Sequence, residues 1–362
     1  MTDEPEVASE NIASAVVKAL TKEISDFQAV DFAEKVDDFI DTGSYALNWG
    51  ICGRPLTGGW PGGRVSEVHG DPSTGKSILL YKAIARATYL GGWGVLDDTE
   101  SSYMKEYGAH LGIDNSRLTP LESSSAEEHF EAMISARKKL RALLGPDRWI
   151  VMGLDSLANL STRNEIAKGF DKVDHGMRAQ LIKKGLRLFR ESGLKTDPKC
   201  VYLVANHVIA NIGDMFNPTT TPGGGGVPFN AAVRVELQPR QRTKVGDRIV
   251  GVASRFVITK NKVFPPYRFG KIHIRYDQGI VPNHDFYECA KAEGVAHECE
   301  ARGWYRMDGV DKKFQQATFY EELVPTALKL VEERSYNNAY NSKEEAVIEG
   351  EEGEDSSKGG GE

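Results

Sequence analysis

The sequence has few cysteines, no long hydrophobic run and no excess of positive charge. Four cysteines in 362 residues are too few for a disulfide framework, so we expect a reducing, cytoplasmic environment. No apolar stretch reaches the about 18 residues that a membrane helix needs, and the acidic, polar start does not resemble a secretory signal. Because the formal net charge is −7, any nucleic-acid site must be a local basic patch.

The most specific motif is a phosphate loop at residues 70–77, which matches the pattern G-x-x-x-x-G-K-[ST] in full. The flanking patterns predict a strand before it and a helix after it. Its glycines allow backbone N–H groups to converge on phosphate oxygens, Lys76 can reach the β- and γ-phosphates, and the Ser77 hydroxyl can ligate Mg²⁺. The predicted nucleoside-triphosphate site consists of Gly70, Asp71, Pro72, Ser73, Thr74, Gly75, Lys76 and Ser77.

Two later segments are apolar strands that end in acidic residues. Residues 149–156 include Asp155, and a carboxylate there can hold the hydration shell of Mg²⁺. Residues 94–100 end in carboxylates that could polarise an attacking water. On chemistry alone, a solvated acidic loop is an equal alternative for this second segment. The candidates in it are Asp97, Asp98 and Glu100.

The order of the predicted elements indicates the fold class. Strands and helices alternate between residues 41 and 290, which is typical of an α/β fold with a mostly parallel twisted sheet and helices on both faces. The expected strands are 64–69, 93–97, 148–154, 200–205, 232–237, 254–260 and 270–276. The expected helices are 76–90, 101–112, 125–143 and 174–192.

Several further segments follow one another along the chain, namely 41–48, 58–70 leading into the phosphate loop, 98–100, 107–114, 204–207, the glycine-rich run 212–226, 259–262 and 303–306. Taken in this order they resemble the RecA ATPase core, and the similarity spans residues 40–320. Bacterial RecA proteins usually have Gln where this chain has His207, which is similar to the phage UvsX-like pattern.

The resemblance implies an ATP- and Mg²⁺-dependent recombinase that forms helical filaments on single-stranded DNA and exchanges strands with homologous duplex DNA. It implies that Glu100 orients the attacking water, that His207 senses the γ-phosphate and that Tyr107 stacks on adenine. Lys260 and Lys262 would come from a neighbouring subunit and stabilise charge at the γ-phosphate. Single-strand-binding protein and a loader are further expected partners, and no membrane partner is expected.

Two segments are expected to contact DNA, mainly through phosphates, because strand exchange must accept any sequence. The glycines of 211–226 permit close approach of a DNA backbone, with a flexible linker as the alternative. Residues 161–177 are expected to form another DNA loop before a basic helix, for which a solvated helix face is the alternative. The candidate contacts are Arg163, Arg178, Arg187, Phe216, Gly223, Gly224 and Gly225.

The chain ends give less specific predictions. Apolar positions at helical spacing within 11–40 form a stripe that either docks on a neighbouring subunit or packs within the chain. Residues 321–362 are predicted to be a short C-terminal extension with a disordered acidic tail. That tail either solubilises the protein or competes with DNA for a basic surface. The candidate interface residues are Ile12, Val16, Leu20 and Phe229.

A zinc site, a hexameric helicase and a RecA-like mediator are the three alternatives to these predictions. His284, Cys289, His297 and Cys299 lack the paired spacings of zinc ligands, and 285–302 is instead predicted to be one helix. A hexameric helicase of the RecA fold would share the phosphate loop but form a ring, and a RecA-like mediator would bind ATP without DNA loops. Filament formation and DNA-stimulated hydrolysis distinguish the recombinase from both.

Overall fold

The computed structural model describes residues 36–169, 175–210, 219–282, 286–315 and 318–341. The predicted N-terminal stripe, Phe216 and the acidic tail lie outside these residues. Internal contacts divide the chain into two units. Unit 1 consists of Met1–Ile40, Trp60–His69 and Leu80–Arg234. Unit 2 consists of Asp41–Gly59, Gly70–Leu79 and Val235–Glu362.

Unit 1 is built on parallel strands in the hydrogen-bonded order β3-β7-β6-β4-β5. Their apolar runs are buried on both faces, as parallel strands require. The predicted α/β class with a largely parallel sheet is therefore confirmed. The strands are β3 (Arg64–Gly70), β4 (Trp93–Asp98), β5 (Leu118–Leu121), β6 (Ile150–Asp155) and β7 (Cys200–Asn206).

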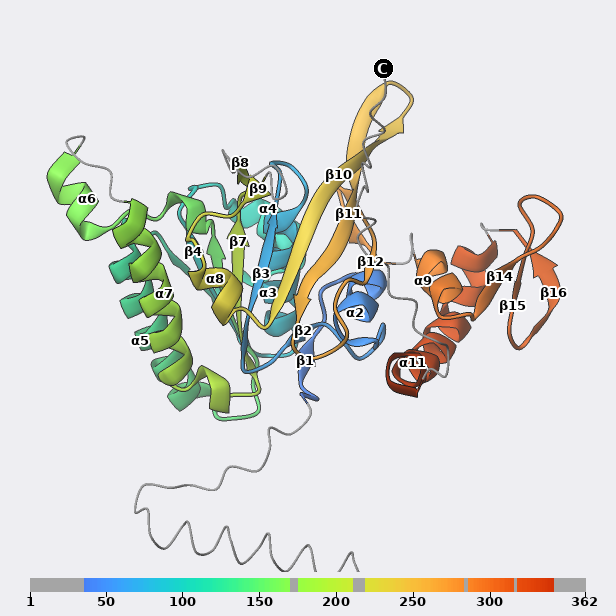
Figure 1. Cartoon of the computed structure of the whole chain (residues 1–362), viewed down its shortest axis with the longest axis horizontal. Helices are drawn as coiled ribbons and strands as arrows, with labels where there is room; N and C mark the ends of the chain where they lie inside the picture. Colours follow the sequence, from blue (N-terminus) through green and yellow to red (C-terminus); the bar gives the residue numbers. More distant parts are fainter. Residues whose placement is uncertain (1–35, 170–174, 211–218, 283–285, 316–317, 342–362) are drawn as a thin grey trace, which may run out of the picture. The chain divides into compact units, whose positions relative to one another are not determined.

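Helices cover both faces of this sheet (Figure 1). Helices α5 (Ala126–Leu144) and α7 (His175–Glu191) lie side by side on one face. They approach closely at Gly185, where an added Cβ would lie 2.0 Å from the Phe130 ring. Helix α3 (Lys76–Tyr89) packs on the other face, where Leu80 lies against Gly153.

Shorter elements complete the described part of unit 1. They are α4 (Lys105–His110), α6 (Arg163–Lys168), α8 (Gly226–Asn230), the strand pairs β1 (Phe39–Ile40) with β2 (Trp60–Pro61) and β8 (Ile209–Ala210) with β9 (Thr219–Thr220), and the 3₁₀ turns Asn115–Arg117, Leu157–Asn159 and Leu194–Thr196. Helix α6 occupies part of the segment 161–177, which was predicted to be a loop. Its start is a capping box, in which Thr162 and Glu165 exchange hydrogen bonds with each other's backbone.

A row of fully buried, hydrogen-bonded polar side chains connects α5 to two strands of unit 1. His129 contacts Asp97 of β4 through Nδ1 and the Tyr202 hydroxyl of β7 through Nε2, each at 2.6 Å. Burial alone would raise the pKa of Asp97, but hydrogen bonds from His129 and Ser123 and the charge of His129 outweigh it, so this pKa is lowered. Burial raises the pKa of Tyr202 well above its ordinary value, so the phenol stays neutral. Asp97 therefore serves the core and is not exposed to an attacking water.

Unit 2 carries antiparallel strands in the order β13-β12-β11-β10 and, in its described part, a small sheet β14-β15-β16. Helix α2 packs on β11 and β12, and α11 packs on α9. The strands are β10 (Val233–Val245), β11 (Arg248–Asn261), β12 (Phe269–Arg275), β13 (Gly279–Val281), β14 (Ala296–Glu298), β15 (Tyr305–Met307) and β16 (Val310–Phe314). The helices are α2 (Tyr45–Cys52), α9 (Phe286–Ala292) and α11 (Val324–Asn341), with a π-helix at Phe319–Leu323.

The prediction of one helix over 285–302 is wrong. Helix α9 ends at Ala292, and Gly294 adopts a left-handed conformation with φ +66°. Such a glycine stops a helix, and β14 begins two residues later. Helix α11 lies within the predicted C-terminal extension. The predicted strands 232–237 and 254–260 are longer in the structure, because β10 and β11 continue toward the turn at Gly246 with mostly exposed residues that carry no hydrophobic alternation.

A second buried polar cluster holds α2, α9 and α11 of unit 2 together. Glu293, which follows α9, accepts hydrogen bonds from Trp49 Nε1 and Asn338 Nδ2, both at 2.6 Å. It also pairs with Arg268 at 2.9 Å, and that guanidinium lies 4.6 Å from the centre of the Trp49 ring. Burial lowers the pKa of Arg268, and Glu293 opposes this shift. The carboxylate therefore compensates a buried cation.

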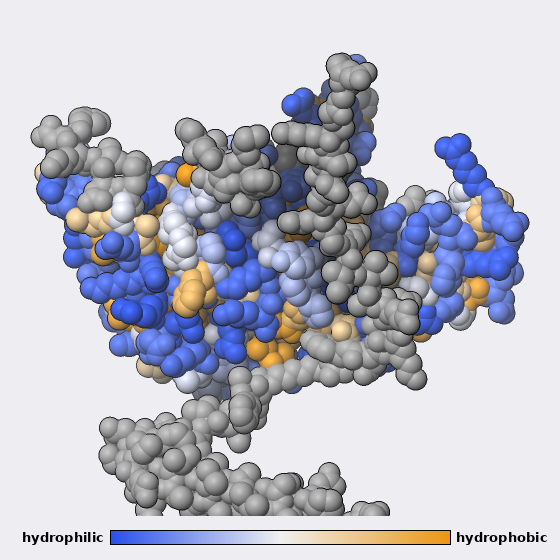
Figure 2. Space-filling model, in the orientation of Figure 1, coloured by the Kyte–Doolittle hydropathy of each residue, from blue (hydrophilic) through white to orange (hydrophobic). Residues whose placement is uncertain are grey.

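The outer surface is mostly hydrophilic on the face that Figure 2 shows, and its hydrophobic spots are small and separate. One such spot lies over α8, the helix that carries Phe229, whose exposed fraction is 69%. Within the described ranges, no helix has both the length and the apolar character needed to cross a bilayer.

We predict that Asp97→Asn destabilises unit 1 by about 1–3 kcal/mol at pH 7, because the carboxylate is the buried partner of His129. The folded pKa of Asp97 is lowered. Its contribution is therefore complete above the unfolded pKa of about 3.9 and is lost as the pH falls through that value toward the folded pKa. Urea unfolding of the wild type and of Asp97→Asn at several pH values measures this difference in the free energy of unfolding. An equal difference at pH 7 and at pH 3 would contradict the assignment.

We predict that Glu293→Ala destabilises unit 2 by about 3–5 kcal/mol, because it leaves the Arg268 guanidinium buried without its carboxylate. Thermal and urea unfolding measure the loss. Glu333→Ala is the matched control, since Glu333 is an exposed acid on the same unit, and it should change stability by less than about 0.5 kcal/mol. Similar stabilities of the two variants would show that the cluster does not hold the helices together.

Candidate active site

The phosphate loop is closed on itself by hydrogen bonds. Lys76 is 7% exposed, and its Nζ donates to the carbonyl oxygens of Gly70 at 2.9 Å and Asp71 at 2.8 Å. The Thr74 hydroxyl donates to the Asp71 carbonyl at 2.8 Å. The Ser254 hydroxyl of β11 donates to the Thr74 carbonyl at the same distance. These bonds fix the loop in the compact shape that a phosphate cradle needs.

Two positions in the loop accept only glycine. At Gly70, with φ +152°, a Cβ would lie 2.1 Å from the Leu237 carbonyl oxygen. At Gly75, with φ +101°, a Cβ would lie 2.0 Å from Ile274 Cδ1. Both glycines therefore let the loop lie directly against β10 and β12. Ser73 adds strain, since it has φ +62° without being glycine.

The parallel strands of unit 1 bring polar side chains to one sheet edge. The register pairs Asp98 of β4 with Asp155 of β6, and His69 of β3 with Asn206 of β7. The carboxyl ends of parallel strands form the edge at which α/β proteins bind ligands. Gly70, which opens the phosphate loop, is the next residue after His69.

The three acids at the end of β4 have different surroundings. Asp97 is buried against His129. Asp98 accepts hydrogen bonds from the backbone N–H groups of Ser102 and Tyr103, at 2.7 and 2.6 Å, and so holds the turn 99–103. This turn explains why the predicted helix 101–112 begins only at Lys105. Glu100 alone of the three presents a partly exposed side chain, with 31% of it accessible.

Glu100, which follows β4, contacts the residues that follow the ends of β6 and β7. Its Oε1 accepts from the Ser156 hydroxyl at 2.8 Å and lies 2.9 Å from His207 Nε2. Thr99 supports this arrangement, because its hydroxyl accepts from the Ser156 N–H and donates to the Ser156 carbonyl, both at 2.9 Å. The structure thus brings together two residues, Glu100 and His207, that lie 107 positions apart.

Asp155 lies at the end of β6 and is only 2% exposed. The Asp155–Ser156 peptide is cis. Burial, together with the nearby Asp155 charge, raises the pKa of Tyr81 on α3, so this phenol stays protonated beside the carboxylate. A carboxylate and a hydroxyl are the hard oxygen ligands that Mg²⁺ prefers, so Asp155 and the partly exposed Ser77 suit this ion chemically.

The remaining nucleotide candidates lie on separate elements. Tyr107, on α4, is half-buried, and burial raises its pKa. Lys260 is partly exposed near the end of β11, and Lys262 is exposed just after it. Asn261 fixes the turn between the lysines: its Nδ2 donates to the Ile51 carbonyl at 2.8 Å, and its Oδ1 accepts from the Val263 N–H at 3.0 Å.

In the described part of the glycine-rich run, most glycines are constrained by packing against α7. Gly223 and Gly224 have φ +93° and +57°. A Cβ on Gly223 would lie 3.0 Å from Leu157, and one on Gly226 would lie 3.0 Å from the Lys183 backbone. Gly225 differs, because an added Cβ there would meet nothing within 4 Å. Among the described glycines 223–226, only Gly225 is thus open at its side-chain position.

The candidate arginines also differ from one another. Arg163 is exposed and pairs with Glu131 at 2.7 Å. Arg178 donates through Nη2 to the carbonyl oxygens of Ala158 and Leu157, so it supports the turn after β6. Arg187 is exposed on α7. The interface candidate Phe229 is exposed as well, with Lys183 Nζ 5.9 Å from its ring centre.

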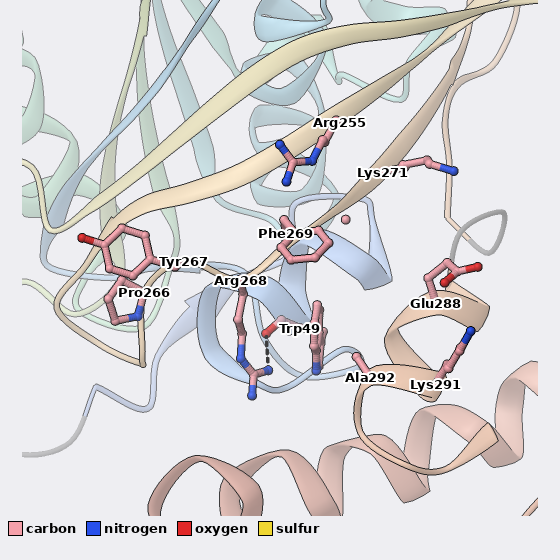
Figure 3. A pocket seen from close by; sticks show the side chains of 11 residues that line it. Trp49, Arg255, Pro266, Tyr267, Arg268, Phe269, Lys271, Glu288, Lys291 and Ala292 are labelled. Atoms are coloured by element: carbon pink, nitrogen blue, oxygen red, sulfur yellow. Dashed lines mark hydrogen bonds between the residues drawn. The ribbon is translucent and has the colours of Figure 1, made fainter. Parts of the chain in front are cut away.

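A pocket of about 830 Å³ in unit 2 was not predicted (Figure 3). Aromatic and cationic side chains alternate along its wall, and the Arg255 guanidinium lies 4.9 Å from the centre of the Phe269 ring. Exposed rings beside cations suit flat, anionic ligands. The only sequence signal was the interleaving of aromatic and basic residues over 267–271. The lining residues include Trp49, Arg255, Tyr267, Arg268, Phe269, Lys271 and Glu288.

A complete phosphate-loop motif directly after a parallel strand is typical of P-loop proteins. The sequence profile of the RecA N-terminal domain matches residues 13–281. The chain therefore belongs to the RecA family.

Named relatives agree with this assignment over most of the chain. Protein RecA of Bacteroides thetaiotaomicron is 30% identical over 276 residues, which are 76% of this chain and 79% of that protein. Protein RecA of Enterococcus faecalis is 29% identical over 339 residues, 91% of this chain and 92% of that protein. Protein RecA of Lactobacillus acidophilus is 27% identical over 339 residues, 92% of this chain and 90% of that protein.

We predict that Gly75→Ala weakens binding of a fluorescent ATP analogue about tenfold or more, because the methyl group meets Ile274 and φ +101° is strained for alanine. Adding Ile274→Val removes the clashing Cδ1 and should restore part of the affinity. Ile274→Val alone is the control. Wild-type affinity of Gly75→Ala, or no recovery in the double variant, would contradict this account of the loop.

Proposed function

We propose that this protein is an ATP-dependent DNA recombinase that forms helical filaments on single-stranded DNA and catalyses pairing and strand exchange with homologous duplex DNA. The observation that carries the proposal is the 2.9 Å contact between Glu100 and His207. Glu100 is the acid suited to polarise water, and His207 precedes the glycine-rich segment that is the candidate DNA loop. A contact between them would link hydrolysis to DNA binding, as in a DNA-dependent ATPase. Family membership supports the same reaction, ATP and water to ADP and phosphate.

The nucleotide is assigned to the phosphate loop. Lys76 would leave the two loop carbonyls and pair with the β- and γ-phosphates, and the loop N–H groups would bind phosphate oxygens. Ser77 and Asp155 would hold Mg²⁺, Asp155 through water. When bound, this ion neutralises charge that develops on the phosphates. Tyr107 is assigned to the adenine ring.

Hydrolysis is assigned to Glu100, which would orient and polarise the attacking water. His207 Nε2 can donate to only one acceptor at a time, either Glu100 or a γ-phosphate oxygen. An exchange of these partners would release Glu100 toward the water and move the start of the segment 207–226. Binding of ATP would in this way alter the affinity for DNA.

Assembly supplies the remaining groups of the proposed reaction. Lys260 and Lys262 would stabilise the γ-phosphate of a neighbouring subunit, and Phe229, with the stripe of Ile12, Val16 and Leu20, would form the subunit interface. This self-assembly produces the filament. DNA contacts are assigned to the exposed Arg163 and Arg187, to Arg178, to Phe216 and to the glycines 223–225.

We further propose a phage UvsX-like pattern within the family, and action in the cytoplasm of a bacterial host. His207 supports the pattern, because UvsX-like recombinases have His at a position where bacterial RecA proteins usually have Gln. Single-strand-binding protein and a loader are the proposed protein partners, since a filament must displace proteins already bound to single-stranded DNA.

We predict that single-stranded DNA stimulates ATP hydrolysis and that Glu100→Gln lowers the stimulated rate by about 10²–10⁴-fold, because an amide cannot act as a base. Lys76→Ala should abolish nucleotide binding. Glu122→Gln is the matched control, since Glu122 is a nearby exposed acid that accepts from Ser101 at 2.7 Å. Steady-state assays of phosphate release measure all four proteins.

Electron microscopy of the same samples separates the alternatives. Helical filaments with DNA-stimulated hydrolysis support the recombinase. Closed rings with unwinding activity would instead indicate a hexameric helicase of the RecA fold. Monomers with DNA-independent hydrolysis would indicate a non-recombining ATPase or mediator.

A further inference from the structure

A buried carboxylate lies directly before the phosphate loop, on β3. The Glu67 side chain is 0% exposed. Its Oε2 accepts from Arg234 Nε at 2.5 Å, and its Oε1 accepts from Asn206 Nδ2 at 2.9 Å. His69 Nδ1 lies 3.8 Å from the same Oε2. A buried carboxylate is tolerated only with such partners, so Glu67 fixes the positions of Asn206 and Arg234.

Both partners of Glu67 also hold the glycine-rich segment. Asn206 Nδ2 donates to the Pro222 carbonyl at 3.0 Å, a bond between residues 16 positions apart. Arg234 Nη2 donates to the Thr221 hydroxyl at 3.3 Å, and Thr221 is 7% exposed. These bonds fix Thr221 and Pro222, which directly follow β9, the strand that pairs with β8.

Asn206 is also bonded to the residue that follows it. Its Oδ1 accepts from the His207 backbone N–H at 3.0 Å. The amide thus uses both of its donors, toward Glu67 and Pro222, and one acceptor, toward His207. A displacement of the His207 backbone must therefore stretch this bond or move the Asn206 amide, which holds Pro222.

We propose that Glu67, Asn206 and Arg234 form a clamp that transmits the position of His207 to the glycine-rich segment. They are positioning residues, because they act on Thr221 and Pro222 and are assigned no contact with ATP or DNA. The clamp would make the affinity for DNA depend on the bound nucleotide. This inference rests on the proposed function.

The test compares the affinity for fluorescent oligo(dT), by anisotropy, in a non-hydrolysable ATP analogue and in ADP. The ratio of the two dissociation constants measures the coupling. Asn206→Ala should bring the ratio at least about fivefold closer to one, because it removes all three amide bonds. The affinity of the Asn206→Ala variant for a fluorescent ATP analogue should change by a smaller factor than the coupling ratio does.

Thr221→Val provides a second, milder variant, since Asn206→Ala leaves Glu67 with one partner fewer and can unfold the chain. Thr221→Val keeps the shape of the side chain and removes only the hydroxyl that accepts from Arg234. The coupling ratio should therefore fall by a smaller factor than in Asn206→Ala. Thr221→Ser keeps the hydroxyl and should keep the wild-type ratio. Tyr202→Phe controls for general loss of stability in unit 1, because it breaks a buried bond away from the clamp.

The outcomes separate the clamp from the proposed function. A lowered ratio in Asn206→Ala and Thr221→Val, with Thr221→Ser and Tyr202→Phe like the wild type, supports the clamp. A wild-type ratio in folded Asn206→Ala or in Thr221→Val overturns it, as does an equal loss in Tyr202→Phe. A wild-type protein whose DNA affinity ignores the nucleotide overturns both the clamp and the proposed function.

Discussion

The parallel pairing of β3, β7, β6 and β4 is the constraint on which the proposed chemistry depends. Because the strands run in one direction and in a fixed register, Asp98, Asp155 and Asn206 end at the same edge of the sheet. The phosphate loop continues from the end of β3. Groups from distant parts of the chain thus meet without any long-range motif, as α/β folds in general permit.

Some polar residues of these strands stabilise the core, and others lie at the candidate site. Side chains alternate across a strand, so neighbouring acids have different surroundings. Asp97 contacts His129 of α5, which in turn contacts Tyr202. Asp98 instead holds the turn 99–103, and Glu100 contacts His207 in the candidate site. The buried partners of Asp97 and Glu67 fix the strand ends. The groups assigned to catalysis therefore project from strands whose buried acids Asp97 and Glu67 are hydrogen-bonded.

Local signals predicted much of this arrangement. The phosphate loop, the strands that end at Asp155 and Asn206, and the helices α5 and α7 have strong hydrophobic periods or a complete motif. The helix assigned to 285–302 failed because α9 ends at Ala292 and Gly294 adopts a left-handed conformation that stops a helix. The Glu67 clamp and the Glu100–His207 contact could not be predicted from spacing, since their partners lie far apart in sequence and only the sheet register brings them together. Resemblance to the RecA family pointed to Glu100 and His207, but not to Glu67.

Strand exchange between circular single-stranded DNA and a homologous linear duplex tests the central claim most directly. We expect ATP-dependent formation of joint molecules that requires homology and is lost in Lys76→Ala. Unwinding of the duplex without homologous pairing, or no DNA product despite DNA-stimulated hydrolysis, would contradict the assignment as a recombinase.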